Sequence, residues 1–438
     1  MGTLHFPQQV IRRKRDGLEL SRAEIEAFVR GATDGSWADY QLSALLMAIF
    51  LRGMTPSETV FLTEAMLKSG SIADLSGVRM VKADKHSTGG GGDKVSLHLA
   101  PMVAACGVAV PMVSGRGLGH TCGTLDKLES IPGLRVSLSI PEFRAQMERI
   151  GLCLIGQTAE LAPADRKLYA LRDVTATVEC IPLICASILS KKLATGIDVL
   201  VLDVKFGRGA FMKDKEAALE LAVAITKVAN AMGTPTRAVL TAMDEPLGRA
   251  VGNALEVAES ILCLGGAGPR DLMEVTYAIG GEMLLLAGAA HDRTHARARL
   301  ERSLESGLAL VKFREMVEAQ GGDPRVAGDP SFLPRARFRR PLQSVARGFV
   351  TRVDALGVAY AVQHLGAGRS RADQPVDHAV GVDGLVKVGE LVTVGQSLCT
   401  IHASSDGAAR EAMEIISTAI EIGETAPVAT RLVDRIVD

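Results

Sequence analysis

The first 70 residues carry apolar side chains at helical spacing, interrupted by polar residues that are typical of helix starts. Residues 21–24 (SRAE) and 55–58 (TPSE) match the capping box, in which a Ser or Thr is followed three positions later by Glu. Pro56 lies at the first helical position after the second cap, where proline is favoured. The pattern predicts an all-helical segment that serves as scaffold.

The pattern changes from about residue 81 onward. Residues 107–113 (GVAVPMV) predict a short buried strand, and residues 197–204 (IDVLVLDV) form the near-continuous apolar run of a parallel strand buried on both faces. A predicted helix over 215–232 and a strand over 237–242 complete a βαβ unit. Residues 164–194 are helical in pattern, and we expect them to leave the sheet and rejoin the first helices.

The last hundred residues differ again. A basic, proline-containing link at 334–341 leads into strands with frequent glycines. Residues 388–398 (VGELVTVGQSL) resemble the turn-and-strand pattern of biotinyl-like sandwich modules. The Met-Lys-Met site that those modules modify is absent from this segment, which disfavours a carrier role.

Composition narrows the class of protein. Of 438 residues, 47% are hydrophobic and 23% charged, which is typical of a globular chain, and the net charge is −1. The only strongly basic run is 12–15, and a solvated helix face explains it better than a nucleic-acid patch. No apolar window suits a membrane span and no signal peptide is expected. The seven scattered cysteines form no CxxC pair, so we expect no disulfide framework, no zinc site and a reducing cytoplasm.

Residues 85–96 read KHSTGGGGDKVS and are the first segment that indicates chemistry. Four consecutive glycines leave backbone N–H groups unshielded and permit positive φ, as a loop around a phosphate requires. Ser87, Thr88 and Ser96 add hydroxyl donors, and Lys85 adds charge. The order is not that of a P-loop, because the lysine precedes the glycines. A flexible connector is the alternative that a glycine run alone leaves open.

Residues 114–129 read SGRGLGHTCGTLDKLE and follow directly on the buried strand. The pattern predicts a loop and then a helix that begins at about Thr124, with Thr124 as its N-cap. Helix N-terminal amides then lie at the mouth of the sheet. Two glycine-rich loops with hydroxyl side chains in one region favour an oxyanion site over a purely structural cap.

These segments resemble the thymidine and pyrimidine-nucleoside phosphorylase family. The family signature matches residues 114–129, and the match continues through 85–90 (KHSTGG), 162–173 (APADRKLYALRD) and 187–192 (SILSKK). Similarity extends over nearly the whole chain. A looser kinship links the family to anthranilate phosphoribosyltransferase, which also has a Lys-His-glycine loop.

The resemblance implies an α/β fold in which a small all-helical domain joins a larger α/β domain, followed by a C-terminal α/β portion that is sandwich-like. The expected helical domain covers 1–68 and 165–195. The phosphate-binding α/β domain covers 69–164 and 196–335, and the C-terminal domain covers 336–438. The active-site cleft is expected between the helical and α/β domains and has to close for catalysis. A cytoplasmic homodimer is also implied.

The resemblance also implies which residues form the site. The phosphate residues are Lys85, Ser87, Ser96, Ser114 and Thr124. The residues that hold the pyrimidine are His86, Arg172, Ser187 and Lys191, of which His86, Arg172 and Lys191 are the catalytic candidates. The residues that line the base and sugar are Leu118, Tyr169, Val178, Ile184 and Phe211.

The implied reaction is the reversible phosphorolysis of thymidine and deoxyuridine to the free base and 2-deoxy-α-ribose 1-phosphate, in pyrimidine salvage and catabolism. As the glycosidic bond breaks, negative charge spreads over the base, and cationic donors aimed at its carbonyl oxygens stabilise the departing anion. His86 is expected to protonate the leaving base near neutral pH. Inorganic phosphate is the co-substrate and attacks the opposite face of the sugar, with inversion; no cofactor or metal is expected.

Three alternatives stay open. The nearest is a pyrimidine-nucleoside phosphorylase that also accepts uridine, although residues 111–113 (PMV) before Ser114 resemble the thymidine enzymes, and the broader ones tend to have Lys-Met there. A phosphoribosyltransferase would need diphosphate and magnesium. A binding or carrier module built on the C-terminal portion is the remote alternative.

Two residues depart from what the family usually has. Cys122 stands where a glycine is usual, and a cysteine at positive φ would cost about 1 kcal/mol or more. Some relatives bind a monovalent cation near residues 92, 94, 247, 250 and 259, but Lys94 would compete with such an ion. No cation is therefore expected.

Overall fold

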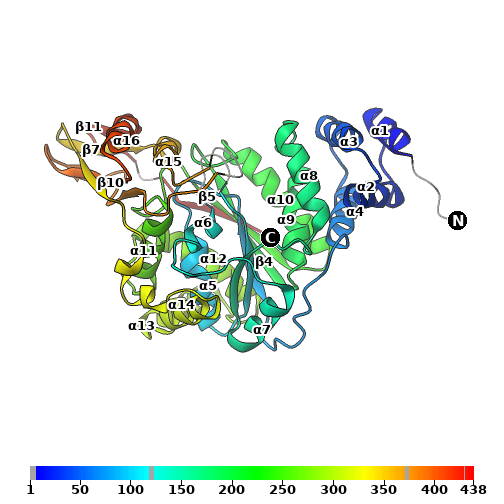
Figure 1. Cartoon of the computed structure of the whole chain (residues 1–438), viewed down its shortest axis with the longest axis horizontal. Helices are drawn as coiled ribbons and strands as arrows, with labels where there is room; N and C mark the ends of the chain where they lie inside the picture. Colours follow the sequence, from blue (N-terminus) through cyan, green and yellow to red (C-terminus); the bar gives the residue numbers. More distant parts are fainter. Residues whose placement is uncertain (1–5, 118–122, 370–373, 429) are drawn as a thin grey trace.

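The protein is described by a computed structural model that covers residues 6–117, 123–369, 374–428 and 430–438. Three regions follow one another along its longest axis (Figure 1). The N-terminal helices lie at one end, a mixed α/β region lies in the middle, and the strands within residues 338–423 lie at the other end. No helix in these described ranges is long and apolar enough to cross a membrane.

The helical region combines two stretches of sequence. Residues Phe28, Trp37, Leu168 and Leu183 belong to one buried core, so the later helices pack on the first four. Both predicted capping boxes are present, with Ser21 and Thr55 accepting hydrogen bonds from Glu24 and Glu58. The helices are α1 (Pro7–Arg15), α2 (Arg22–Asp34), α3 (Asp39–Arg52), α4 (Pro56–Leu67), α8 (Pro163–Val174) and α9 (Ile181–Leu193).

One basic residue of α1 is not solvated, contrary to expectation. Lys14 is 3% exposed, and its ammonium nitrogen lies 2.8 Å from a carboxylate oxygen of Glu58 on α4. The run 12–15 is therefore only partly a surface feature, because one of its four charges holds two helices together.

The central region is built on a mostly parallel sheet. Its strands are β1 (Ala83–Ser87), β2 (Val110–Ser114), β3 (Leu152–Gly156), β4 (Val199–Phe206), β5 (Thr236–Ala242) and β12 (Val433–Val437). β1 pairs with β4 and β4 with β5, all parallel, and β2 pairs with β3 in parallel. A bridge between Lys82 and Ala109 joins the two sets. The carboxyl ends of β1, β2 and β4 consequently meet at one edge.

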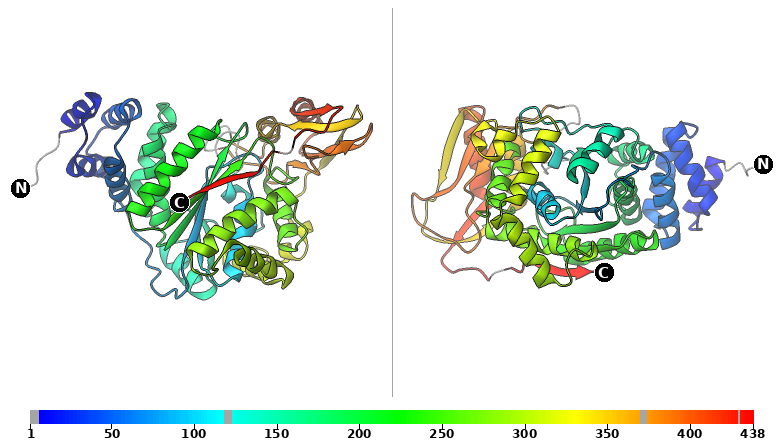
Figure 2. Two further views of the ribbon diagram at one scale, coloured as in Figure 1. Left: turned by 180° about the vertical axis from the view of Figure 1, so that it is seen from behind. Right: turned by 90° about the horizontal axis from the view of Figure 1, so that it is seen from below.

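β4 confirms the prediction of a strand buried on both faces. Val199 and Val201 pack in the core that includes α5 and α12, whereas Leu200 and Leu202 pack in the core that includes α9 and α10. Figure 2 shows helices on both sides of the strands. The helices of this region are α5 (Val95–Ala105), α6 (Thr124–Leu128), α7 (Ile140–Ile150), α10 (Lys215–Ala231), α11 (Asn253–Leu264), α12 (Arg270–Leu286), α13 (Arg293–Glu305) and α14 (Leu308–Ala319), with the 3₁₀ turns η1 (Pro324–Ala327) and η2 (Pro330–Phe332).

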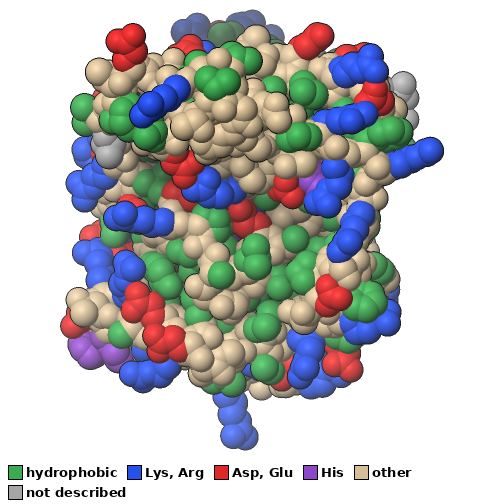
Figure 3. Space-filling model, turned by 90° about the vertical axis from the view of Figure 1, so that its left-hand side faces the viewer, with side chains coloured by type: hydrophobic (Ala, Val, Ile, Leu, Met, Phe, Trp, Pro, Cys, Tyr) green, Lys and Arg blue, Asp and Glu red, His purple; other side chains and the backbone are tan. Residues whose placement is uncertain are grey.

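The C-terminal region has its own core, formed by two small sheets and two helices. Its elements are β6 (Phe338–Gln343), β7 (Gly348–Val353), α15 (Ala355–His364), β8 (Gly381–Asp383), β9 (Leu391–Val392), β10 (Ser397–Ala403), α16 (Asp406–Ala419) and β11 (Ile420–Gly423). Lys, Arg, Asp and Glu side chains are interspersed over the face that this end of the molecule presents in Figure 3.

The last strand differs from expectation. The C-terminal domain is expected to cover residues 336–438, but β12 pairs antiparallel with β5, with Ile436 opposite Val239. Figure 2 shows this strand, in red, beside the central sheet. Its two charged residues, Asp434 and Arg435, suit an edge strand.

A neutral histidine lies in the core of the central region. The imidazole of His98 on α5 is fully buried, with Nε2 2.8 Å from the Thr276 hydroxyl and Nδ1 3.4 Å from the Ser260 hydroxyl. Thr276 donates its own proton to the Leu272 carbonyl, so Nε2–H of His98 donates to Thr276. Burial, together with the nearby charges of Lys94 and Lys85, lowers the pKa of His98 to about 3.

This histidine predicts how stability responds to acid. The folded pKa lies below the unfolded one, so the unfolded state binds the proton first and stability falls as the pH drops below 6.5. Replacing His98 by Asn should remove up to about 1.4 kcal/mol of that loss per pH unit. Chemical denaturation at pH 6.5 and pH 4.5 measures the effect, with the exposed His291→Asn as control. Equal pH dependence of wild type and His98→Asn would contradict the assignment.

Candidate functional site

The first glycine-rich loop connects β1 to α5, and its glycines have separate structural reasons. Gly89 and Gly92 have φ of 86° and 78°, the left-handed region that favours glycine. A Cβ on Gly90 would lie 2.6 Å from the Met243 side chain, and one on Gly91 would lie 2.9 Å from the Ala355 carbonyl oxygen. The loop is therefore packed between β5 and the start of α15, and a freely moving connector is excluded.

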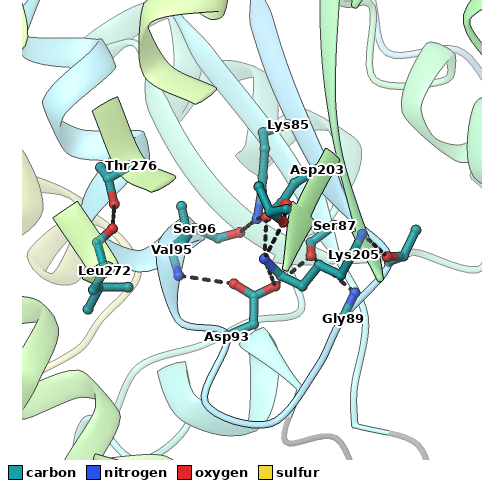
Figure 4. Close-up of polar contacts among 12 residues, drawn as sticks. Lys85, Ser87, Gly89, Asp93, Val95, Ser96, Asp203, Lys205, Leu272 and Thr276 are labelled. Atoms are coloured by element: carbon teal, nitrogen blue, oxygen red, sulfur yellow. Dashed lines mark hydrogen bonds and ion pairs between the residues drawn. The ribbon is translucent and has the colours of Figure 1, made fainter. Parts of the chain in front are cut away.

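Three predicted phosphate residues gather below this loop (Figure 4). Lys85 is 1% exposed on β1, and its ammonium nitrogen lies 3.4 Å from the hydroxyl of Ser96 on α5. Ser87, at the end of β1, donates its hydroxyl proton to Asp93 over 2.5 Å and accepts from the Gly89 N–H. The structure thus brings together an ammonium group and two hydroxyl groups at the carboxyl end of β1.

Ser114 and Thr124 flank the second glycine-rich loop. Ser114 ends β2 next to β1, and Thr124 is the first residue of α6. The N-cap of α6 is Gly123 and not Thr124 as predicted, because Gly123 is extended and Thr124 is already helical. A Cβ on Gly123 would stand 2.1 Å from the Gly117 nitrogen, so this position requires a glycine. The predicted site residue Leu118 and the unusual Cys122 lie outside the described residues.

Asp126 holds the described ends of this loop. Its carboxylate accepts from the Gly117 N–H at 2.7 Å and from Arg116 at 3.2 Å, and it is 2% exposed. Arg369, which follows α15, donates to the same carboxylate over 2.5 Å. The C-terminal region therefore contributes one side chain to the support of this loop.

The predicted base residues on α9 also lie together. The Lys191 ammonium group donates to the hydroxyl of Ser187, one turn earlier, at 2.8 Å. It also pairs with Asp165 on α8, which is 3% exposed. About a quarter of the Lys191 side chain stays exposed, so its charge is accessible from outside.

Arg172 is buried near the end of α8. It is 2% exposed, and its guanidinium group donates to the carbonyls of Thr177, Val178 and Leu183, at 3.2, 2.5 and 3.1 Å. Three of its five N–H donors are thus used on carbonyls of the turn between α8 and α9 and of the first turn of α9. Burial lowers the pKa of Arg172, but an arginine keeps its charge.

The neighbouring Lys192 connects the two groups of residues. It is 2% exposed, so its side chain does not belong to a solvated face of α9. Its ammonium group donates to Asp84 Oδ2 at 2.7 Å, to the Lys85 carbonyl at 2.8 Å and to the Val113 carbonyl at 2.8 Å. Helix α9 is consequently fastened to the ends of both β1 and β2.

His86 lies between the two groups and is a neutral imidazole. Burial, together with the charges of Lys192, Lys191 and Lys85, holds the pKa of His86 well below its usual range. A neutral imidazole can donate one hydrogen bond but has no proton to release at pH 7. The expectation that His86 protonates the leaving base near neutral pH is therefore not supported by its surroundings.

The predicted lining residues lie partly in the helical region and partly in the central region. Tyr169, Val178 and Ile184 are half-buried on or between α8 and α9, and the Arg172 guanidinium lies 5.7 Å from the centre of the Tyr169 ring. Phe211, 48% exposed, follows β4 in the central region. Two hollows of about 550 and 370 Å³ lie elsewhere, beside 375–379 and between α5, α7 and α14, and no predicted site residue lines either.

Sequence reasoning missed the charged residues that surround the predicted ones. Asp84, Asp93, Asp203 and Lys205 are buried next to Lys85 and Ser87, and Asp165 pairs with Lys191. The sequence did contain one signal. Asp203 lies within the apolar run of β4 and Lys205 follows it directly, and a buried charge is costly unless it is paired.

Lys94 is the residue that we expected to compete with a monovalent cation. Its fully buried ammonium group donates to the Leu247 carbonyl at 2.6 Å and lies 2.9 Å from Glu259. In the described part of the chain, no group of three or more His, Cys, Asp or Glu residues could hold a metal ion.

Comparison with known proteins agrees with the succession of regions along the chain. Three family models match in succession: the helical bundle domain of a glycosyl transferase family over residues 8–70, its a/b domain over 79–310, and the pyrimidine nucleoside phosphorylase C-terminal domain over 349–423. The fold resembles that of anthranilate phosphoribosyltransferase from Thermus thermophilus, with a TM-score of 0.59 and 20% identity over 71% of this chain and 99% of that one. That likeness concerns the fold alone.

Curated relatives are much more similar. The chain is 48% identical to a pyrimidine-nucleoside phosphorylase of Geobacillus stearothermophilus over 91% of this chain and 92% of the relative. It is 46% identical to a thymidine phosphorylase of Burkholderia cenocepacia over 99% and 100%, and 47% identical to human thymidine phosphorylase over 96% and 89%. The chain therefore belongs to the thymidine and pyrimidine-nucleoside phosphorylase family and is a pentosyltransferase.

Proposed function

We propose that this protein cleaves thymidine, and deoxyuridine, with inorganic phosphate, giving the free base and 2-deoxy-α-ribose 1-phosphate. One observation carries the proposal. A group of phosphate-type donors at the ends of β1 and β2 and a group of cationic donors on α8 and α9 are fastened to each other through Lys192. The names of the relatives supply the substrate class.

In this mechanism the phosphate is held by Lys85, Ser87, Ser96, Ser114 and Thr124. The bond between the sugar C1′ and the base N1 breaks, and its electron pair goes to the base. A phosphate oxygen forms the new bond on the opposite face of C1′, and the departing base anion takes up the proton that the hydrogen phosphate loses. The site lies in the cleft between the helical and α/β domains, which closes to exclude water.

The base side of the site stabilises the departing anion. Lys191 carries an accessible charge, and Ser187 adds a hydroxyl group. Arg172 has two N–H donors left after its three carbonyl bonds, one on each terminal nitrogen. His86 contributes a hydrogen bond from its neutral ring and not a proton, a role compatible with the lysines around it.

Phosphate and nucleoside are the reactants that the proposal requires, with no cofactor. A cytoplasmic location agrees with the six described cysteines, all of which are free and buried. Burial raises the pKa of these thiols, to about 12 for Cys263 and Cys399, so they have little thiolate character.

A broader specificity that includes uridine is the second candidate. The chain is 48% and 49% identical to pyrimidine-nucleoside phosphorylases and 46–47% identical to thymidine phosphorylases. A difference this small favours neither group.

The first test measures base release from thymidine, deoxyuridine and uridine side by side, with and without phosphate and with no added metal. We expect phosphate-dependent release, with the highest kcat/KM for thymidine. Comparable kcat/KM for uridine would favour the broader enzyme. Equal release without phosphate would indicate a hydrolase and contradict the proposal.

The two sides of the site should respond differently to mutation. Ser96→Ala and Thr124→Ala each remove a phosphate donor and should mainly raise the KM for phosphate. Lys191→Ala removes a charge that faces the base, where negative charge develops only as the bond breaks, and should lower kcat about 10²–10³-fold. Bisubstrate kinetics separate the constants. An effect of Lys191→Ala on the phosphate KM alone would reverse the assignment of the two sides.

The homodimer is also proposed, through helix α3. Tyr40, Met47 and Leu51 are 76%, 37% and 70% exposed, and their spacing of seven and four residues puts them on one side of the helix. An exposed apolar stripe of this kind is suited to a second copy of the chain.

Light scattering after size-exclusion chromatography tests the dimer. The wild type should elute with twice the mass of one chain, and Met47→Glu with Leu51→Glu should shift it toward the monomer, because charges would be buried at the contact. Val345→Glu is the matched control, since Val345 is 93% exposed in the C-terminal region. A monomeric wild type would disprove this arrangement.

A further inference from the structure

Four buried charges lie together at the first glycine-rich loop (Figure 4). They are Lys85, Asp93, Asp203 and Lys205, from β1, the loop itself and β4. Lys85, Asp203 and Lys205 are at most 1% exposed, and the Asp93 side chain is 7% exposed. Two ammonium and two carboxylate groups balance to zero, so this cluster is neutral before any phosphate binds.

Each acid of the cluster holds one predicted phosphate residue. Asp203 lies 3.5 Å from the Lys85 ammonium nitrogen. Asp93 accepts the hydroxyl proton of Ser87 at 2.5 Å and the N–H of Val95, at the start of α5, at 3.4 Å. A serine hydroxyl has one proton to donate, and Asp93 accepts it here, so Asp93 sets the direction of the Ser87 hydroxyl, which has to turn away from Asp93 to donate to phosphate.

Lys205 stands between the two acids. Its ammonium nitrogen lies 2.9 Å from Asp203 and 4.0 Å from Asp93, and it donates to the Thr241 hydroxyl at 3.3 Å. Thr241 in turn donates to Asp203 at 2.6 Å. Burial alone would lower the pKa of Lys205, but the two carboxylates raise it above its usual value, so the group is charged. The same lysine therefore neutralises the mutual repulsion of the acids that hold Lys85 and Ser87.

The backbone of Lys205 takes part as well. Its N–H donates to the Thr88 hydroxyl at 2.9 Å, one residue after Ser87. The loop is thus attached to β4 through both the side chain and the main chain of one residue. Lys205 has no exposed surface and points to the acids, so it acts on phosphate through its neighbours.

We propose that Lys205 is a positioning residue for phosphate, which orients Lys85 through Asp203 and Ser87 through Asp93. The proposal rests on the phosphorolysis proposed above. Without the Lys205 charge, the cluster would have a net charge of −1 where an anion has to bind. The Asp93 and Asp203 carboxylates would also repel each other and move the two phosphate donors apart.

The test compares Lys205→Met with wild type in bisubstrate kinetics and in calorimetric titration with inorganic phosphate alone. We expect the KM for phosphate to rise at least about 10-fold, with the KM for thymidine within about 2-fold, and Lys205→Arg to recover part of the loss. Lys14→Met is the matched control: it also breaks a buried pair between a lysine and a carboxylate, but in the helical domain, and should leave both KM values unchanged.

A milder variant keeps the proposal testable if Lys205→Met does not fold. Thr241→Val keeps the shape of the side chain but removes the donor to Asp203, and should raise the KM for phosphate by a smaller factor in the same direction. An active wild type whose Lys205→Met and Thr241→Val variants keep the phosphate KM, or lose affinity for both substrates equally, would overturn the positioning role. A wild type without phosphate-dependent base release would instead disprove the proposed function.

Discussion

The geometry of the candidate site depends on the buried ammonium group of Lys192. An ammonium group has three N–H donors, and here Asp84, the Lys85 carbonyl and the Val113 carbonyl accept all three. Because Lys85 lies on β1 and Val113 lies next to Ser114 on β2, one side chain of α9 sets the position of both phosphate strands. Any movement of the helical region against the sheet has to break these bonds or turn about them.

Buried charges around this anchor occur in pairs. Lys192 faces Asp84, Lys94 faces Glu259, Lys127 faces Glu256, and Lys205 faces Asp203. Removing one partner from such a pair leaves an uncompensated charge in the interior, which is far more costly than losing the pair as a whole. The region around the site therefore keeps its charged groups at fixed positions, which favours preorganised donors over donors that have to be ordered by substrate.

The sequence predicted the parts of this protein that follow local rules. Capping boxes located the helix starts at Ser21 and Thr55, and the apolar run of β4 predicted a strand covered on both faces. The glycine-rich segments and the family motifs indicated the phosphate and base residues, whose roles stay predictions. The sequence could not show that Arg172 donates to carbonyls of the following turn. It also could not show that Lys192 donates to carbonyls of two strands that lie 79 and 107 residues away along the chain. Those partners depend on tertiary packing, which periodicity along the chain does not encode.

The pairing of β12 with β5 affects the order in which the protein can fold. The C-terminal region, from β6 to β11, lies in the sequence between the other strands of the central sheet and this edge strand. During synthesis the ribosome therefore has to complete that whole region before the central sheet can receive its edge. Until then the open side of β5 presents unpaired backbone groups to solvent and to other chains. The nascent protein is consequently most exposed to wrong strand pairing at a stage when most of the site-bearing sheet already exists.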